Sequence, residues 1–350
     1  MSIRYFDKTN NFEKYKDVKS ILIIGDNALE KPFFTIVIPT YKRANLFTEA
    51  LKSAVNQEYV GEYEILIIDN EPYEGIINET EKIVRSFSDE RINYYRNERN
   101  IGMFGNWNRC IELAKSNWIC MLHDDDYLDL RYLYEIHQIL ISRPDAGIIS
   151  SRFNVIEHNT YENKYKLFAQ RGIKKILSLF QKNITHIKMV DYLFGYSCPI
   201  VGSCFSRSQA IEIGGFDEDF YPSADYFFIA KFIHYFRNVY FYRKSIYNYR
   251  IFANESLSIA KETWFLDDYN FISFLIDTYN FKYKQCLVYL NLSILKDRIE
   301  KNNLKKEVDY YIKYSFVDTK LNEMRFTMCK KIICKSFLSV FMIYKYYFRL

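Results

Sequence analysis

The sequence predicts an α/β fold built on a mainly parallel sheet with helices on both faces. Short apolar, β-branched runs alternate with segments in which apolar residues recur at helical spacing. The run 33–38 (Phe-Phe-Thr-Ile-Val-Ile) begins this alternation and the run 118–122 ends it. Strands joined through helices run parallel. Polar residues that directly follow three of the runs should therefore gather at one rim of the sheet, where such proteins bind ligands.

The expected elements follow the order β-α-β-α-β-α-β. We expect strands at 33–38, 64–68, 92–95 and 118–122, and helices at 44–57, 76–86 and 105–116. The segment 44–57 has the pattern of a typical amphipathic helix, because its apolar residues recur every three or four positions. The later chain is less regular; helices are expected at 173–180, 187–194 and 225–236, strands at 239–242 and 245–250, and a helical, basic region from about 262.

Charge is distributed unevenly over the 350 residues, whose net charge is +5. Residues 281–350 carry 15 Lys and Arg against 6 Asp and Glu, whereas the rest carries 33 against 37. A basic tail beside a mildly acidic body suits an anionic partner such as a membrane surface or a nucleic acid.

The seven cysteines indicate a reducing compartment. Their number is odd and no C-x-x-C pair occurs, which argues against a disulfide framework and a zinc site. We also expect no signal peptide at the charged N-terminus and no transmembrane helix, since the apolar run 336–348 is short and contains Lys345. The expected location is therefore cytoplasmic.

Three consecutive carboxylates, Asp124, Asp125 and Asp126, follow the strand expected at 118–122. Stacked negative charge at the end of a buried strand is costly unless a cation or hydrogen-bond donors compensate it. Oxygen ligands of this kind suit Mg²⁺ or Mn²⁺ held together with phosphates. The alternative is an acidic N-cap of a helix beginning at Tyr127, although a cap needs a single Asp.

Four ordered motifs resemble the inverting family 2 glycosyltransferases. They are Thr-Ile-Val-Ile-Pro-Thr-Tyr-Lys-Arg at 35–43, Ile-Ile-Asp-Asn at 67–70, Asn-Ile-Gly at 100–102, and the segment 122–128. Gly-Gly-Phe-Asp-Glu at 214–218, followed by Asp225-Tyr226, is similar to the acceptor-side segment of that family. The resemblance covers roughly 33–260. It implies a GT-A fold, a nucleotide-sugar donor and a divalent metal, Mn²⁺ or Mg²⁺, in a domain at 33–260, with an N-terminal extension at 1–32 and a helical, basic C-terminal region at 261–350.

The resemblance also implies a donor site at the rim of the sheet. Its residues are Pro39, Thr40, Tyr41, Arg43, Asp69, Asn100, Gly102, Asp124, Asp125 and Arg250. Tyr41 can stack on a nucleobase, and Asp69 can accept hydrogen bonds from a base edge or a ribose. Arg43 could pair with Asp69, approach a phosphate, or be a plain surface residue. Gly102 permits close backbone approach, and Arg250 could clamp a phosphate or form an ion pair at the edge of the core.

The acidic segment allows two registers of the D-x-D pattern found in the family. Asp124 and Asp126 can form the pair, with Asp125 close by; we favour this register and expect all three as metal ligands. Alternatively, His123 replaces the first Asp and Asp125 is the ligand. The sequence leaves both open.

Asp225 is the candidate catalytic base. Relatives carry an acidic pair before an aromatic residue, whereas this chain has Ala224-Asp225-Tyr226, so one acid is missing. A base must deprotonate the acceptor hydroxyl in an inverting transfer. The competing interpretation is that Asp225 caps the helix expected at 225–236.

The predicted function is transfer of a hexose or N-acetylhexosamine, most simply from a UDP-sugar, to a capsule, lipooligosaccharide or O-antigen glycan. The segment 330–346 mixes cations with apolar residues, which suits an amphipathic helix on the inner membrane face, near lipid-linked acceptors; packing on the body is the alternative. Competing functions are a sugar-nucleotide nucleotidyltransferase, which would want glycine after the first strand, and a non-catalytic glycan- or nucleotide-binding module. Nucleic-acid binding is not expected.

Overall fold

The computed structural model describes residues 5–26, 29–156, 183–193, 198–251, 261–279, 284–301 and 320. The chain divides into two compact units. The first contains Met1–Glu162, Lys182–Met189 and Ser197–Asn254, and the second contains Asn163–Gln181, Val190–Tyr196 and Glu255–Leu350. The first unit therefore holds the N-terminal segment together with the region that the motifs cover.

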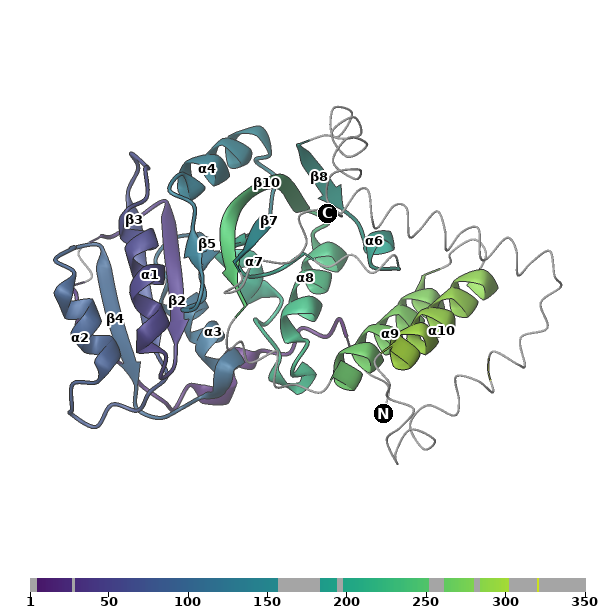
Figure 1. The fold of residues 1–350 in the computed structure, drawn as a ribbon, viewed down its shortest axis with the longest axis horizontal. Coiled ribbons are helices and arrows are strands. Elements are labelled where there is room, and N and C mark those ends of the chain that lie inside the picture. Colours follow the sequence, from purple (N-terminus) through teal and green to yellow (C-terminus); the bar gives the residue numbers. More distant parts are fainter. Residues whose placement is uncertain are drawn as a thin grey trace, which may run out of the picture. The chain divides into compact units, whose positions relative to one another are not determined.

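One sheet organises the first unit (Figure 1). Its strands are β1 (Ser20–Ile24), β2 (Phe34–Thr40), β3 (Tyr63–Asp69), β4 (Ile92–Asn97), β5 (Trp118–Met121), β6 (Tyr127–Leu128), β7 (Ile148–Ile156), β8 (Ile184–Ile187), β9 (Cys204–Ser206) and β10 (Val239–Arg250). The helices are η1 (Asn11–Tyr15), α1 (Ala44–Val55), α2 (Glu79–Ser86), α3 (Gly102–Leu113), α4 (Tyr132–Ser142), α6 (Met189–Leu193), α7 (Arg207–Glu212), η2 (Glu218–Phe220) and α8 (Ala224–Tyr235).

The strand order is β1-β4-β3-β2-β5-β9-β7-β10-β6, with β8 paired to β10. The four expected strands form β4-β3-β2-β5 in parallel pairing, so the predicted α/β class is confirmed. Beyond β5 the sheet is mixed, because β9 pairs antiparallel with both β5 and β7. The two late strands expected separately form one strand, β10, whose register with β7 shifts between Tyr242 and Ser245.

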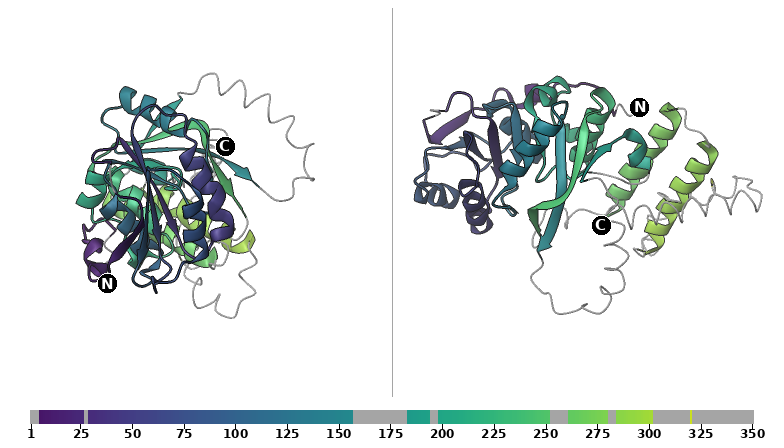
Figure 2. Two further views of the ribbon diagram at one scale, coloured as in Figure 1. Left: turned by 90° about the vertical axis from the view of Figure 1, so that its left-hand side faces the viewer. Right: turned by 90° about the horizontal axis from the view of Figure 1, so that it is seen from above.

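The two faces of the sheet are covered by different helices, as Figure 2 shows. Alternate residues of a strand point to opposite faces. Ile36 and Ile38 of β2 belong to one core together with Phe47 and Leu51 of α1 and with residues of α4. On the other face, Asn106 of α3 donates a hydrogen bond to the carbonyl oxygen of Ile68, at 3.0 Å. This double coverage explains why the parallel strands are apolar throughout.

The N-terminal segment, expected as an extension, is part of the first unit. β1 pairs antiparallel with β4 at the edge of the sheet. Arg109 of α3 donates to the carbonyl oxygens of Val18 (2.8 Å) and Tyr15 (2.9 Å), which fixes the segment against α3.

The second unit contains α9 (Lys261–Thr278) and α10 (Lys284–Lys301). Leu292, Leu295 and Ile299 of α10 form a small core with residues of α9. Asn291 also donates to the carbonyl oxygen of Tyr269, at 3.1 Å. In the described part of the chain, no helix has the length and apolar character of a membrane span. The helix expected at 173–180 and the amphipathic segment 330–346 lie outside the described residues.

Candidate active site

The acidic turn lies directly after β5, beside the end of β2. Val37 and Met121 are register partners in the parallel pair, and the N–H of Leu122 donates to the carbonyl oxygen of Val37 at 3.0 Å. The N–H of Asp126 donates to the carbonyl oxygen of His123 at 3.2 Å, which closes the turn. The helix-cap alternative is wrong: Tyr127 and Leu128 form β6, and the next helix begins at Tyr132.

The end of β2 and the loop after it bind the first two carboxylates of this turn. Thr40 Oγ1 donates to Asp124 Oδ2 at 2.8 Å. Arg43 Nη1 lies 2.9 Å from Asp125 Oδ2 and 3.6 Å from Asp124 Oδ1. Arg43 therefore belongs to the acidic turn and is no isolated surface cation.

Asp126 is held by the last strand of the sheet. The Tyr247 hydroxyl donates to Asp126 Oδ2, and the backbone N–H of Arg250 donates to Asp126 Oδ1 at 2.8 Å. The Arg250 guanidinium donates to the carbonyl oxygen of Asp125 and pairs with Glu49 of α1. Arg250 is buried, and the edge-of-core ion pair foreseen as its alternative role is present. Its guanidinium fastens the acidic turn to α1.

Negative charge in this turn is only partly compensated. Asp124, Asp125 and Asp126 are each at most 5% exposed. Burial raises the pKa of Asp124 to about 6 and that of Asp126 to about 7, and the Asp125 charge raises both further. Burial lowers the pKa of the half-buried His123 to about 4. A cation in this turn would relieve the carboxylate repulsion.

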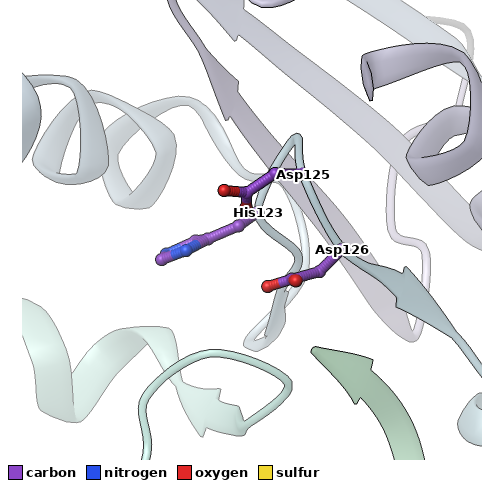
Figure 3. Close-up of side chains that lie close together, drawn as sticks. All are labelled: His123, Asp125 and Asp126. Carbon is purple, nitrogen blue, oxygen red and sulfur yellow. The ribbon is translucent and has the colours of Figure 1, made fainter. Parts of the chain in front are cut away.

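Three side chains of the turn have ligand atoms that fit a metal ion. One ligand atom each of His123, Asp125 and Asp126 lies within 4.8 Å of the other two (Figure 3). His123 Nε2 and Asp125 Oδ1 are buried and have no hydrogen-bond partner among the described residues. Two carboxylates and an imidazole form a donor set that divalent cations accept. The residues present therefore fit the metal that the sequence implies. This group corresponds to the register in which His123 takes the first position, and Asp124 lies toward Thr40 and Arg43.

The neighbouring strand end carries Asp69, whose two carboxylate oxygens both accept hydrogen bonds. Its Oδ1 accepts from the N–H of Glu71 at 2.9 Å, and its Oδ2 accepts from Asn78 Nδ2 and the Tyr94 hydroxyl, both at 2.8 Å. Burial raises the pKa of Asp69, while the hydrogen bond from Asn78 opposes this shift. Asp69 thus orders the loop after β3 at the expected rim.

The 100–102 loop adjoins the same rim through Asn70. The Asn70 side chain donates to Asn100 Oδ1 at 2.8 Å and to the carbonyl oxygen of Gly102 at 3.1 Å. The backbone N–H of Asn70 donates to the carbonyl oxygen of Thr40 at 2.9 Å. Gly102 has φ +74, a conformation that favours glycine. Asn70 is therefore the link between β2 and this loop.

Tyr41 and Pro39 lie where β2 leaves the sheet. Pro39 is the sixth residue of β2, and Tyr41 is 42% exposed just beyond it. Lys42 Nζ lies 5.4 Å from the centre of the Tyr41 ring. An exposed aromatic ring beside a cation can receive the flat face of a nucleobase.

Asp225 is the second residue of α8 and lies in its first turn. The N-cap residue is Ser223, and Asp225 Oδ1 accepts from the N–H of Tyr226 at 2.8 Å. The competing interpretation, in which Asp225 caps this helix, is wrong about the N-cap position, although the carboxylate does accept a backbone N–H of the first turn. Burial raises the pKa of Asp225 to about 6. A carboxylate with a pKa near neutrality suits general-base chemistry.

A line of aromatic contacts connects the acidic turn with α8. Trp107 of α3 contacts the His123 ring (centroids 4.9 Å apart) and the Phe216 ring (5.2 Å), and Phe216 stacks on Phe228 of α8 at 4.1 Å. Trp107 therefore packs between the acidic turn and the Gly-Gly-Phe segment. The candidate metal group and the helix of the candidate base thus share one packed framework.

The N-terminal segment supports the Gly-Gly-Phe turn. Gly214 has φ +86, and a Cβ there would lie 1.8 Å from the carbonyl oxygen of Thr9. Asn11 donates to the carbonyl oxygen of Gly214 through both its backbone N–H (3.1 Å) and its side chain (3.0 Å). The sequence contained no signal for this contact, because the partners are about 200 positions apart.

Known proteins resemble this chain in sequence and in fold. The sequence model of the family "Glycosyl transferase family 2" matches residues 35–206. A GalNAc(5)-diNAcBac-PP-undecaprenol beta-1,3-glucosyltransferase of Campylobacter jejuni is 25% identical over 232 residues, which cover 65% of this chain and 68% of that relative.

Two solved structures share the fold. S. aureus TarS 1–349, in complex with UDP-GlcNAc, superposes with a TM-score of 0.59 at 15% identity, covering 81% of this chain and 79% of the TarS 1–349 chain. The mannosyltransferase PcManGT from Pyrobaculum calidifontis, in complex with GDP-Man and Mn²⁺, gives 0.50 at 13% identity, covering 94% and 90%. The fold is that of the GT-A glycosyltransferases. Residues 35–206 therefore belong to glycosyltransferase family 2.

Proposed function

We propose that the protein is a metal-dependent, inverting glycosyltransferase of glycan biosynthesis. It transfers a hexose or N-acetylhexosamine from a nucleotide sugar, with UDP-sugars as the first candidates, to a hydroxyl group of a cell-surface glycan. The observation that carries this proposal is the pair of buried, unpartnered ligand atoms, His123 Nε2 and Asp125 Oδ1, at the rim where β2 and β5 end.

The donor is assigned to the rim residues that surround this turn. Tyr41 offers an exposed ring for the nucleobase. Asp69, Asn100 and Gly102 order the loops on which the nucleoside would rest. Arg43 and Arg250, which already contact the acidic turn, supply positive charge near the diphosphate.

The metal is assigned to the acidic turn, with Asp125 and Asp126 as its carboxylate ligands. When bound, a divalent cation there neutralises charge that develops on the leaving nucleoside diphosphate. Asp124, hydrogen-bonded to Thr40 and close to Arg43, shapes the donor side of the turn.

Asp225 is assigned as the base. Its carboxylate takes the proton of the acceptor hydroxyl, the hydroxyl oxygen forms the new bond to the anomeric carbon, and the bond from that carbon to the diphosphate oxygen breaks with its electron pair. A single displacement of this kind inverts the anomeric configuration. The raised pKa of Asp225, about 6, leaves most of it ionised at neutral pH while keeping it basic enough to accept a proton.

The known proteins support this choice of donor and acceptor class. The Campylobacter jejuni relative is named for glucose transfer to a polyprenyl-diphosphate-linked glycan. TarS was crystallised with UDP-GlcNAc, and PcManGT with GDP-Man and Mn²⁺. A lipid-linked glycan is therefore the first acceptor to test.

The test is a panel of UDP-glucose, UDP-galactose, UDP-GlcNAc, UDP-GalNAc and GDP-mannose, each with and without Mn²⁺. We expect one donor to raise the thermal midpoint and to be slowly hydrolysed, in both cases only with the metal. A chain in which no donor gives a metal-dependent response would contradict the proposal.

A further inference from the structure

We propose that His123 is a direct metal ligand, so that this glycosyltransferase uses a site of one imidazole and two carboxylates that prefers Mn²⁺ to Mg²⁺. The inference rests on the proposed function, because it concerns the metal of that site. It goes further by assigning the ligand atoms and by predicting which cation the enzyme selects.

The first support is the position of the three ligand groups. One ligand atom each of His123, Asp125 and Asp126 lies within 4.8 Å of the other two, and all three residues belong to one short turn (Figure 3). A single cation can therefore contact all three after small side-chain adjustments.

The second support is the hydrogen bonding of the same atoms. Asp125 is 4% exposed, and its Oδ1 has no partner among the described residues, while Arg43 takes its Oδ2. His123 Nε2 is also buried and, in the described part of the chain, lacks a partner. Buried polar atoms without partners are costly. A bound cation would satisfy both atoms at once.

The third support is the different environment of Asp124. Its Oδ2 accepts the Thr40 hydroxyl at 2.8 Å and its Oδ1 lies 3.6 Å from Arg43. Asp124 is thus committed to the loop after β2. The ligand atom next to Asp125 and Asp126 comes from His123 instead.

The imidazole also packs against an aromatic ring. The Trp107 ring lies 4.9 Å from the His123 ring, and Trp107 is itself packed between Phe104 and Phe216. Packing of this kind restricts the orientation of the ring before a metal arrives.

The choice of cation follows from the donor atoms. Mg²⁺ strongly prefers oxygen ligands and near-ideal octahedral geometry, whereas Mn²⁺ accepts a nitrogen ligand more readily than Mg²⁺ does. One imidazole should therefore shift the preference toward Mn²⁺. Replacing it by a carboxylate should restore an all-oxygen site.

The experiment measures Mn²⁺ binding and the nitrogen coupling of the bound ion. Full-length wild-type protein is titrated with Mn²⁺ in the presence of UDP or GDP, and binding is followed by loss of the free-ion EPR signal. Pulsed EPR then detects ¹⁴N modulation of bound Mn²⁺, and ¹⁵N-histidine labelling confirms its source. We expect the modulation in wild type and in His186→Gln, a control at an exposed histidine outside the site.

Two variants give the contrast. His123→Asp should retain Mn²⁺ without ¹⁴N modulation and should bind Mg²⁺ more tightly than wild type does. His123→Ala should weaken Mn²⁺ by about tenfold or more, since even partners outside the ligand shell contribute that much. Thermal midpoints of the metal-free proteins establish that both variants fold.

The outcomes separate the inference from the proposed function. Bound Mn²⁺ without nitrogen coupling in wild type, or coupling that survives in His123→Asp, overturns the His123 ligand and leaves metal dependence intact. Failure of wild type to take up Mn²⁺ with either nucleotide overturns metal dependence and the inference together.

Discussion

The side chain of Asn108 brackets the backbone of Phe216. Its Nδ2 donates to the carbonyl oxygen of Phe216 at 2.8 Å, and its Oδ1 accepts from the N–H of Phe216 at 2.7 Å. Asn108 belongs to α3, which begins at Gly102 in the candidate donor site, while Phe216 precedes α8 and stacks on its Phe228. These two hydrogen bonds therefore tie the candidate donor side to the candidate acceptor side.

Asn108→Ala should lower both stability and transfer. It leaves two buried backbone groups without partners, at about 1–3 kcal/mol for each. Chemical denaturation measures this loss of stability. Initial rates should show a larger decrease in kcat than in donor affinity, because Asn108 positions the segment before Asp225. The control is Asn154→Ala, which removes one exposed hydrogen bond to Asn248 and should change stability by less than about 0.5 kcal/mol. Equal losses of stability in the two variants would argue against a special role of the two hydrogen bonds between Asn108 and Phe216.

Asp225→Asn should separate binding from chemistry. The amide keeps the shape but cannot accept the acceptor proton, so the transfer rate should fall about 10²- to 10⁴-fold. Donor protection in thermal shift assays should stay as in wild type. Asp219→Asn, at a neighbouring carboxylate with 80% side-chain exposure, is the matched control. Turnover by Asp225→Asn at the wild-type rate would remove Asp225 from the mechanism.

The transfer rate of wild type should rise with pH and level off above about 6. The base must be ionised, and burial raises the pKa of Asp225 to about 6. Below that value kcat/KM should fall about tenfold per pH unit. The profile is measured at saturating Mn²⁺ and low donor concentration. A rate that is flat down to pH 5 would show that another group accepts the proton.

The same shift makes Asp225 a cost to stability at neutral pH. In the folded protein its pKa is about 6, against the ordinary value of 3.8. Between these values the folded state binds more proton than the unfolded state, so the free energy of unfolding falls as pH rises through this window. Asp225→Asn should therefore raise the thermal midpoint at pH 8, and the difference should vanish near pH 4. A lower midpoint at both pH values would indicate a structural role instead.

Arg43→Met should make the protein depend more on metal for its stability. Arg43 lies 2.9 Å from Asp125 Oδ2, and its removal leaves the acidic turn with less positive charge. The metal-free protein should lose about 1–3 kcal/mol, and Mn²⁺ should raise its thermal midpoint by more than that of wild type. Arg99→Met, which removes an exposed pair with Asp17, should change neither quantity appreciably. An identical Mn²⁺ response in Arg43→Met and wild type would contradict this charge balance.

The central sheet could be predicted because its strands are marked locally. The runs at β2, β3 and β5 are mostly apolar since both faces are buried, and Pro39, Asp69 and the acidic turn mark where they reach the rim. The early helices show their covered face by periodicity. By contrast, β1 and β9 are short segments whose strand state depends on pairing with β4 and β5.

What the sequence alone determined was the α/β order, the rim at which Tyr41, Asp69 and the acidic turn meet, and the candidate base. These features depend on neighbouring residues and on the topology that parallel strands impose. Only the tertiary structure decided which side chains of the turn approach one another, that Arg43 pairs with Asp125, and that Asn108 holds Phe216. Such choices depend on turn geometry and on contacts between residues as much as 108 positions apart, about which local pattern carries no information.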